Sequence, residues 1–176
     1  MHTVAGFIMR NDVNLFFLFN RKMRCRILNI LMRGITQLGS TTFSILLSAL
    51  LIFLGHGSLH TAGIQMALVL STAQIIAQSL KRLVNRPRPY KTLEEAIAIK
   101  PPSCKYSFPS GHSCAALSMA LALATNLAVL GWVALALAIF VGVSRVYLGF
   151  HYPTDVFAGF TISTVAFLLV NTFFPY

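Results

Sequence analysis

The sequence alternates between long apolar runs and short polar connections, a pattern typical of a protein that crosses a membrane several times. A helix that spans a bilayer needs about 20 mostly apolar residues. The apolar run at 113–143 is too long for a single crossing, so we divide it near Asn126–Gly131 into two helices joined by a tight turn. The pattern then predicts five transmembrane helices, at about residues 40–59, 61–80, 112–128, 130–148 and 154–174.

Two segments depart from this pattern. Residues 1–38 combine large apolar side chains with closely spaced basic residues, and we expect an amphipathic helix that lies in the membrane interface. Residues 81–110 are rich in proline and charge, and we expect a loop outside the hydrocarbon. The predicted fold is an all-α integral membrane protein, with an interfacial segment at 1–38 before a membrane-embedded domain at 39–176.

The composition supports a membrane protein and narrows its partners. Only 10% of the residues are charged, against about a quarter in a soluble domain. The net charge is +10, but the basic residues sit beside apolar spans. We therefore expect anionic lipid headgroups and a phosphorylated substrate as partners, and no nucleic acid. The three cysteines show no CxxC spacing, so the sequence predicts neither a disulfide framework nor a zinc site.

Alternating spans bring several ionisable residues to one membrane face. The loop 81–110 and the connection 149–153 must lie on the same side of the membrane. His56 and His60 are expected at the opposite interface, without a chemical role. An ionisable cluster beside hydrocarbon is a candidate functional site. The residues predicted to meet there are Lys81, Arg88, His112, Arg145, His151 and Asp155.

The basic members of this cluster suit a tetrahedral phosphate dianion. Lys81, Arg88 and Arg145 can surround its oxygens. In "PSGH", Ser110 and Gly111 can direct a hydroxyl group and backbone N–H groups toward an anion at a helix N-terminus. The neighbouring basic residues Arg82 and Arg86 are expected to face lipid headgroups.

The remaining members suggest a nucleophile and a proton donor. Asp155 follows His151 by four residues, so its carboxylate can reach one ring N–H and leave the other nitrogen free to attack phosphorus. His112 is the candidate that protonates the leaving oxygen. Two-metal phosphatases need several carboxylates, and this face offers Asp155 with Glu94 and Glu95. We therefore expect a reaction through a phosphohistidine that uses no metal and no cofactor.

Three motifs together resemble the type 2 phosphatidic acid phosphatase family, membrane lipid phosphatases related to vanadium-dependent haloperoxidases. They are "KRLVNRPRP" at 81–89, "PSGH" at 109–112 and "SRVYLGFHYPTD" at 144–155, and the resemblance extends over roughly residues 36–170. It implies that His151 is the nucleophile, Asp155 orients it and His112 is the general acid. It also implies that 81–110 is the active-site loop, and that phosphate is bound by Lys81, Arg88, Ser110, Gly111 and Arg145.

The resemblance implies a lipid phosphate as substrate and leaves its tail open. We favour a prenyl diphosphate, such as undecaprenyl diphosphate, and phosphatidate or phosphatidylglycerophosphate is the alternative. A non-catalytic membrane protein that binds anionic lipid is a third hypothesis. The combination of His112, His151 and Asp155 argues against it, because binding alone requires no nucleophile.

The side of the membrane that carries the site also stays open. Bacterial members of the family often have a further span before the amphipathic segment, so five spans here replace six. The basic residues at 21–33 and in the loop 81–110 lie on the side of the site, and the positive-inside rule places that side in the cytoplasm. Bacterial relatives usually place the site outside.

Overall fold

The structure, a computed structural model, describes residues 4–99 and 104–175. The remaining residues, 1–3, 100–103 and 176, belong to the predicted segments 1–38, 81–110 and 39–176 and lie outside this description. The described residues form helices and no β-strand, which confirms the predicted all-α class. The elements are α1 (Val4–Phe17), the π-helical turn η1 (Leu18–Lys22), α2 (Arg26–Gln37), α3 (Thr41–Leu54), α4 (Ser58–Val84), α5 (Pro89–Thr92), α6 (Gly111–Asn126), α7 (Ala128–Tyr147) and α8 (Pro153–Phe173).

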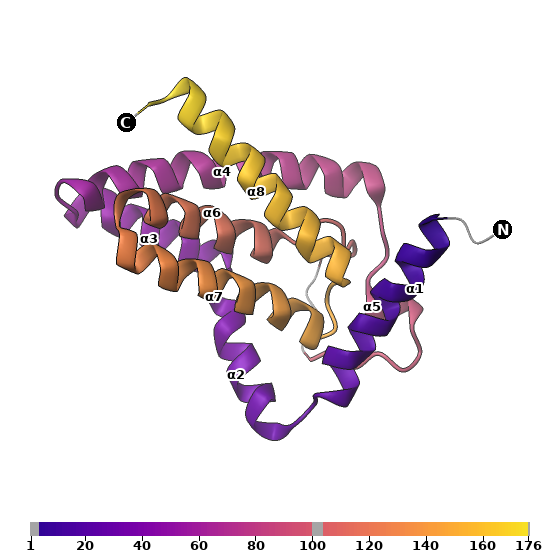
Figure 1. Cartoon of the computed structure of the whole chain (residues 1–176). Coiled ribbons are helices and arrows are strands. Elements are labelled where there is room, and N and C mark those ends of the chain that lie inside the picture. The colour runs from indigo at the N-terminus through magenta and orange to yellow at the C-terminus, as the bar shows by residue number, and fades with distance from the viewer. Residues whose placement is uncertain (1–3, 100–103, 176) are drawn as a thin grey trace.

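Helix α6 lies at the centre of the bundle and contacts α3, α4, α7 and α8 (Figure 1). Small residues allow this close packing, as is common between helices in membranes. A Cβ atom added to Gly131 on α7 would lie 2.1 Å from the Cα atom of Ala124 on α6. A Cβ atom added to Gly159 on α8 would lie 2.6 Å from the carbonyl oxygen of Ser110. The helices that carry the candidate residues are therefore held at backbone contact distance.

Each predicted span coincides with a helix, and α6 ends and α7 begins near the predicted division. Three helices, α4, α7 and α8, are long and apolar enough to cross a membrane. The pair α2 and α3, bent by 50°, would make a fourth span if it is counted as one. The 16 residues of α6 extend roughly 24 Å, less than the hydrocarbon core of about 30 Å. A multi-pass membrane protein is confirmed, and the number of five spans stays a prediction.

The N-terminal segment differs from the single amphipathic helix that the sequence predicts. Helix α1 and turn η1 form one arm, and the chain then reverses and continues as α2 toward α3 (Figure 1). Helix α2 begins where the Cys25 sulfur accepts a hydrogen bond from the backbone N–H of Leu28, at 3.5 Å. Helix α1 lies at the end of the bundle where α8 begins (Figure 1). The interfacial location of this segment stays a prediction.

One end of the bundle collects the candidate residues. The C-terminal ends of α4 and α7 and the N-terminal ends of α6 and α8 all lie there (Figure 1). Lys81 lies in the last turn of α4, which ends at Asn85 with a left-handed backbone, φ 51°. His56 precedes α4 and therefore lies at the opposite end, as predicted.

Candidate active site

His151 lies in the short connection between α7 and α8. Gly149 adopts a φ of +84°, which favours glycine and turns the chain back. The backbone N–H groups of Phe150 and His151 then donate to the carbonyl oxygen of Arg145, at 3.1 and 3.3 Å. This turn buries the His151 side chain, which is 2% exposed. The imidazole is thus held by a tight backbone turn at the end of the bundle.

The predicted pair of His151 and Asp155 is adjacent but does not form the expected hydrogen bond. Nδ1 of His151 and Oδ2 of Asp155 are 3.6 Å apart, beyond hydrogen-bond distance. Other donors occupy the carboxylate: Oδ2 accepts the backbone N–H of Tyr152 at 2.8 Å, and Oδ1 accepts Nη1 of Arg86 at 2.7 Å. The buried Nδ1 atom has no hydrogen-bond partner within the described part of the chain. The arrangement therefore supports electrostatic assistance of the ring by Asp155.

The other ring nitrogen identifies the tautomer. Nη1 of Arg88 lies 3.3 Å from Nε2 of His151. A guanidinium group can only donate, so Nε2 must accept in this contact. In a neutral imidazole the proton is then on Nδ1, on the side of Asp155. Nε2 consequently carries the lone pair that could attack phosphorus.

Three predicted phosphate ligands form a buried group of cations. Arg88 donates to the carbonyl oxygens of Cys104 and Phe150, at 2.8 and 2.9 Å. Arg145 donates to the Thr36 hydroxyl at 2.8 Å and lies over the Phe150 ring at 4.7 Å, while its Nε atom has no partner. Lys81 is 8% exposed. None of the three forms a salt bridge with a carboxylate among residues 4–99 and 104–175. A phosphate dianion would offset most of this positive charge.

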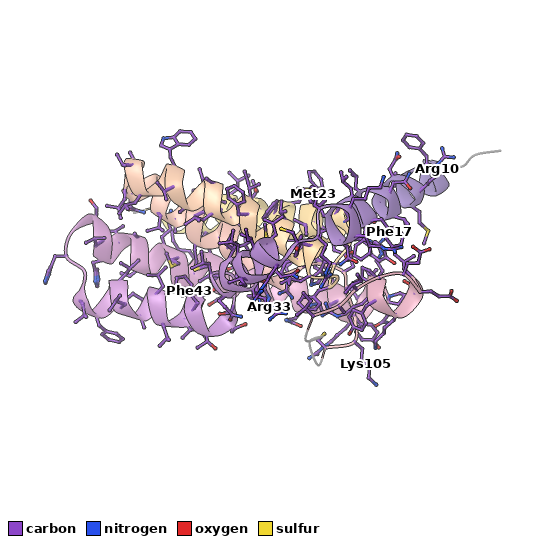
Figure 2. All side chains as sticks on the ribbon, turned by 90° about the horizontal axis from the view of Figure 1, so that it is seen from below. Arg10, Phe17, Met23, Arg33, Phe43 and Lys105 are labelled. Atoms are coloured by element: carbon purple, nitrogen blue, oxygen red, sulfur yellow. The ribbon has the colours of Figure 1, made fainter. Side chains whose placement is uncertain are left out.

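A cavity of about 360 Å³ opens beside Arg145, whereas Lys81, Arg88 and His151 are not among its lining residues. His112 lines it from the first turn of α6, Arg145 from α7 and Arg33 from α2. The remaining lining residues are Thr36, Gln37, Ile99, Leu148 and Phe150, and none of the lining residues is acidic. Figure 2 shows Arg33 on the face of the molecule seen from below. The cavity joins the predicted proton donor to two cations, and it suits an anionic ligand.

In the "PSGH" segment, Ser110 fixes the start of α6. The buried Ser110 hydroxyl accepts the backbone N–H of Ser113 at 3.4 Å and shares a hydrogen bond with the Ser113 hydroxyl at 2.7 Å. Ser110 is thus the N-cap of α6, and its side chain points into the protein. Gly111 is half-buried, and its carbonyl oxygen accepts Nε2 of Gln74 at 3.1 Å. The helix start is well fixed, and phosphate binding by Ser110 and Gly111 stays a prediction.

The prediction that Arg86 faces lipid headgroups is wrong. Arg86 forms salt bridges with Asp155 and Asp12, both at 2.7 Å, and lies over the Tyr152 ring at 4.0 Å. Burial opposes the charge of Arg86, but the two carboxylates raise its pKa above the usual value. Asp12 was not predicted as a site residue at all. Its signal in the sequence is that it is one of only four acidic residues.

The environment of His151 predicts the pH dependence of the reaction. Burial, followed by the charges of Arg145, Arg88 and Lys81, holds the pKa of His151 well below its usual value. An attacking imidazole must be unprotonated, so activity falls only as the pH drops through this lowered pKa. We expect the acid limb of kcat/KM to lie below about pH 6.5, the ordinary histidine value. A pH profile of kcat/KM checks this expectation, and an acid limb above that value would contradict it.

Among residues 4–99 and 104–175 no three histidine, cysteine, aspartate or glutamate side chains form a group that could hold a metal ion. The metal-independent reaction stays a prediction that needs a direct test.

Comparisons with known proteins agree with the predicted family. The sequence profile of the PAP2 superfamily matches residues 62–176. The chain is 35% identical over 161 residues to phosphatidylglycerophosphatase B of Bacillus subtilis, which covers 83% of this chain and 75% of that protein. It is 29% identical to undecaprenyl-diphosphatase of Sulfolobus acidocaldarius, over 91% of this chain and 77% of that protein.

Solved structures show the same fold. The PAP2-type phosphatidylglycerolphosphate phosphatase from Bacillus subtilis superimposes with a TM-score of 0.77 at 32% identity, covering 98% of this chain and 87% of that one. LpxE of Aquifex aeolicus gives a TM-score of 0.79 at 26% identity, with coverages of 91% and 94%. With the geometry of the site, these likenesses confirm the prediction from the motifs: the chain belongs to the PAP2 superfamily of membrane lipid phosphate phosphatases.

Proposed function

We propose that this protein hydrolyses a prenyl diphosphate, such as undecaprenyl diphosphate, through a phosphohistidine and without a metal ion. One observation carries the reaction type. Nε2 of the buried His151 faces Nη1 of Arg88 at 3.3 Å, beside two further cations that have no carboxylate partner in the described chain. A phosphoryl group held by these cations would lie next to the ring nitrogen.

The proposed reaction has two steps that balance. Nε2 of His151 forms a bond to the terminal phosphorus, and the bond between phosphorus and the bridging oxygen breaks. His112 gives its proton to that oxygen, so the lipid leaves as a monophosphate. Water then attacks the phosphohistidine, His112 takes a proton from the water, and His151 is released together with inorganic phosphate. Asp155 stabilises the positive ring that exists between the two steps.

The cavity supports a diphosphate as substrate. Arg33 lines the same cavity as Arg145 and His112 but comes from α2, which carries none of the family motifs. Its side chain is exposed and has no salt bridge among the described residues. Lys81, Arg88 and Arg145 suffice for one phosphoryl group. Arg33 could therefore bind the second phosphate, which becomes part of the leaving group.

An apolar cavity beside the site supports a lipid tail. It has a volume of about 130 Å³ and lies between α3, α6 and α7. Ala116, one turn after His112, and Val141, one turn before Arg145, line it. Its other lining residues are Leu38, Phe43, Leu47, Met119, Ala120, Leu123, Ala134, Leu137 and Ala138. The hydrocarbon tail of a lipid substrate could lie along this apolar surface, with its phosphate at the cations.

The second candidate substrate is phosphatidate or phosphatidylglycerophosphate. The specific observation in its favour is that the 35% identical relative is named phosphatidylglycerophosphatase B. Phosphate release from a prenyl diphosphate and from phosphatidate, in detergent with EDTA, distinguishes the substrates and tests the metal-free mechanism. We expect release in EDTA, with a higher kcat/KM for the prenyl diphosphate. No release from either lipid by the folded protein would favour the lipid-binding hypothesis, and loss in EDTA would contradict the metal-free reaction.

Replacement of Arg33 by alanine tests the proposed role of this residue. Loss of a charged hydrogen bond to the second phosphate should raise KM for a prenyl diphosphate about tenfold or more, with little change for the corresponding monophosphate. Arg26→Ala is the matched control, because Arg26 is an exposed arginine on the same helix that does not line the cavity. Equal effects of Arg33→Ala on both substrates would exclude a second-phosphate site at Arg33.

The distribution of charge supports a site on the cytoplasmic side. Exposed basic residues at 21–26 and Arg82 lie at the end of the bundle that carries the site, while the turn between α6 and α7 has no lysine or arginine. The exposed Glu94, replaced by cysteine, would report the side to an impermeant thiol reagent. The background must lack Cys25, Cys104 and Cys114, of which Cys25 and Cys104 are exposed. We expect protection in intact cells and labelling after lysis. Labelling of intact cells would place the site outside.

A further inference from the structure

Asp12 reaches from α1 to the start of α8. Its Oδ1 atom accepts the backbone N–H of Thr154 at 2.9 Å. Its Oδ2 atom accepts the Thr154 hydroxyl at 2.6 Å and Nη2 of Arg86 at 2.7 Å. The Asp12 side chain is 1% exposed. A buried carboxylate in an apolar helix is unfavourable unless it is paired. The partners of Asp12 are Thr154, which precedes Asp155, and Arg86, which forms a salt bridge with Asp155.

The first contact fixes the turn that carries Asp155. The first N–H groups of a helix have no partner within the helix and are usually capped by a nearby side chain. Tyr152, at the N-cap of α8, provides no side-chain cap for these groups. Asp12 supplies the missing acceptor for Thr154 from another helix. The position of Asp155, the next residue, therefore depends on α1.

The second contact divides the charge of Arg86 between two carboxylates. Nη1 of Arg86 donates to Asp155, and Nη2 donates to Asp12. Because one cation serves two anions, Asp155 keeps part of its negative charge for the His151 ring. Without the charge of Asp12, Arg86 would neutralise Asp155 more completely.

We propose that Asp12 is a positioning residue of the active site, which acts on His151 through Arg86 and Asp155. The proposal rests on the proposed roles of His151 and Asp155. It makes α1, which lies outside the three family motifs, part of the catalytic apparatus.

A purely structural role of Asp12 would have a different effect. Phe16, on the same helix, is fully buried and packs against the Tyr152 ring, with 5.9 Å between the ring centroids. This apolar contact can dock α1 without the charge of Asp12. Asp12→Asn keeps an oxygen that can accept the N–H of Thr154. It removes the charge and replaces Oδ2, the acceptor of Arg86, by an NH2 group that can only donate. The amide variant therefore separates docking from electrostatics.

The experiment compares Asp12→Asn, Arg86→Gln and the double variant in phosphate release from whichever lipid phosphate the wild type hydrolyses. We expect Asp12→Asn to lower kcat about tenfold and to leave KM within about twofold. A loss of this size is typical when a residue that orients a functional side chain is replaced. In the Arg86→Gln background the same change should have a much smaller effect, because the two residues act in series. Asn14→Ala is the control on α1, since Asn14 is exposed and takes no part in the hydrogen bonds that join Asp12, Arg86, Thr154 and Asp155.

The pH profile provides a readout that docking alone would not change. His151 is surrounded by Lys81 of α4, Arg88 before α5, His112 of α6, Arg145 of α7 and Asp155 of α8. Loss of the negative charge at Asp12 leaves these groups in place and makes the surroundings of the ring more positive. The acid limb of kcat/KM should move to lower pH in Asp12→Asn.

Several outcomes would overturn the proposal. Wild-type kcat and pH profile in a folded Asp12→Asn protein, or equal effects of Asp12→Asn with and without Arg86, would exclude it. If Asp12→Asn does not fold, Arg86→Gln decides, because it removes the guanidinium that joins Asp12 to Asp155. An unchanged kcat in that variant would also contradict the proposal. His151→Ala is measured in parallel: if it stays active, the proposed function fails, whereas an inactive His151→Ala beside a wild-type-like Asp12→Asn refutes only the role of Asp12.

Discussion

Replacement of His151 by alanine is expected to lower phosphate release by about 10⁴-fold or more, because the attacking nitrogen is lost. The buried ring has Nε2 within 3.3 Å of Nη1 of Arg88, where the three cations would hold a phosphoryl group. A water molecule in place of the ring would not be held by the backbone turn that fixes His151. Phosphate release in detergent, with substrate well above KM, measures the loss.

The matched control for this variant is His56→Ala. His56 is an exposed histidine at the opposite end of the bundle, and its removal should leave turnover unchanged. Acid-labile, base-stable labelling of the wild type by a substrate with radioactive terminal phosphate would identify the phosphohistidine, and His151→Ala should not be labelled. Substantial turnover by folded His151→Ala would remove His151 from the role of nucleophile.

Replacement of Asp155 by asparagine is the second change with a large expected effect. The amide loses the negative charge that stabilises the positive ring, and a comparable change in a catalytic triad lowers kcat about 10⁴-fold. Asparagine keeps an oxygen for the backbone N–H of Tyr152, so the start of α8 should survive. Arg86 would lose one of its two carboxylates but keep Asp12. We expect a fall in kcat of the same order, with KM changed much less.

Substrate binding distinguishes this result from misfolding. Inhibition by inorganic phosphate should be retained in Asp155→Asn, because Lys81, Arg88 and Arg145 are unchanged. The melting temperature in detergent should stay close to that of the wild type. Turnover near the wild-type value would exclude Asp155 from the mechanism and would leave its bond to Arg86 as its main role.

Local sequence signals predicted the parts of the site that depend on helix ends. Alternation of the spans brings Lys81, His112 and Arg145 to one face whatever the packing of the helices. These residues meet in the structure as predicted, although their catalytic roles stay predictions.

The parts that the sequence did not predict depend on contacts between distant segments. The salt bridge between Arg86 and Asp12 joins residues 74 positions apart, and no spacing rule identifies such a pair. Arg86, the backbone N–H of Tyr152 and His151 all lie next to the two oxygens of the Asp155 carboxylate. Only the structure shows that Arg86 and Tyr152 form the hydrogen bonds. The motif also did not reveal that the buried Ser110 hydroxyl pairs with Ser113 at the start of α6. The division of the N-terminal segment into α1 and α2 likewise depends on packing against α7 and α8.

The buried cations affect the thermal stability of the protein. Lys81, Arg88 and Arg145 are removed from water and have no carboxylate partner in the described chain, so their mutual repulsion opposes folding of this end of the bundle. The unpaired cations lower the free energy of unfolding of the protein and at the same time favour binding of an anion. Any phosphate that occupies it shifts the folding equilibrium toward the native state by mass action. We therefore expect the free protein to be its least heat-resistant form, and inorganic phosphate to raise its melting temperature.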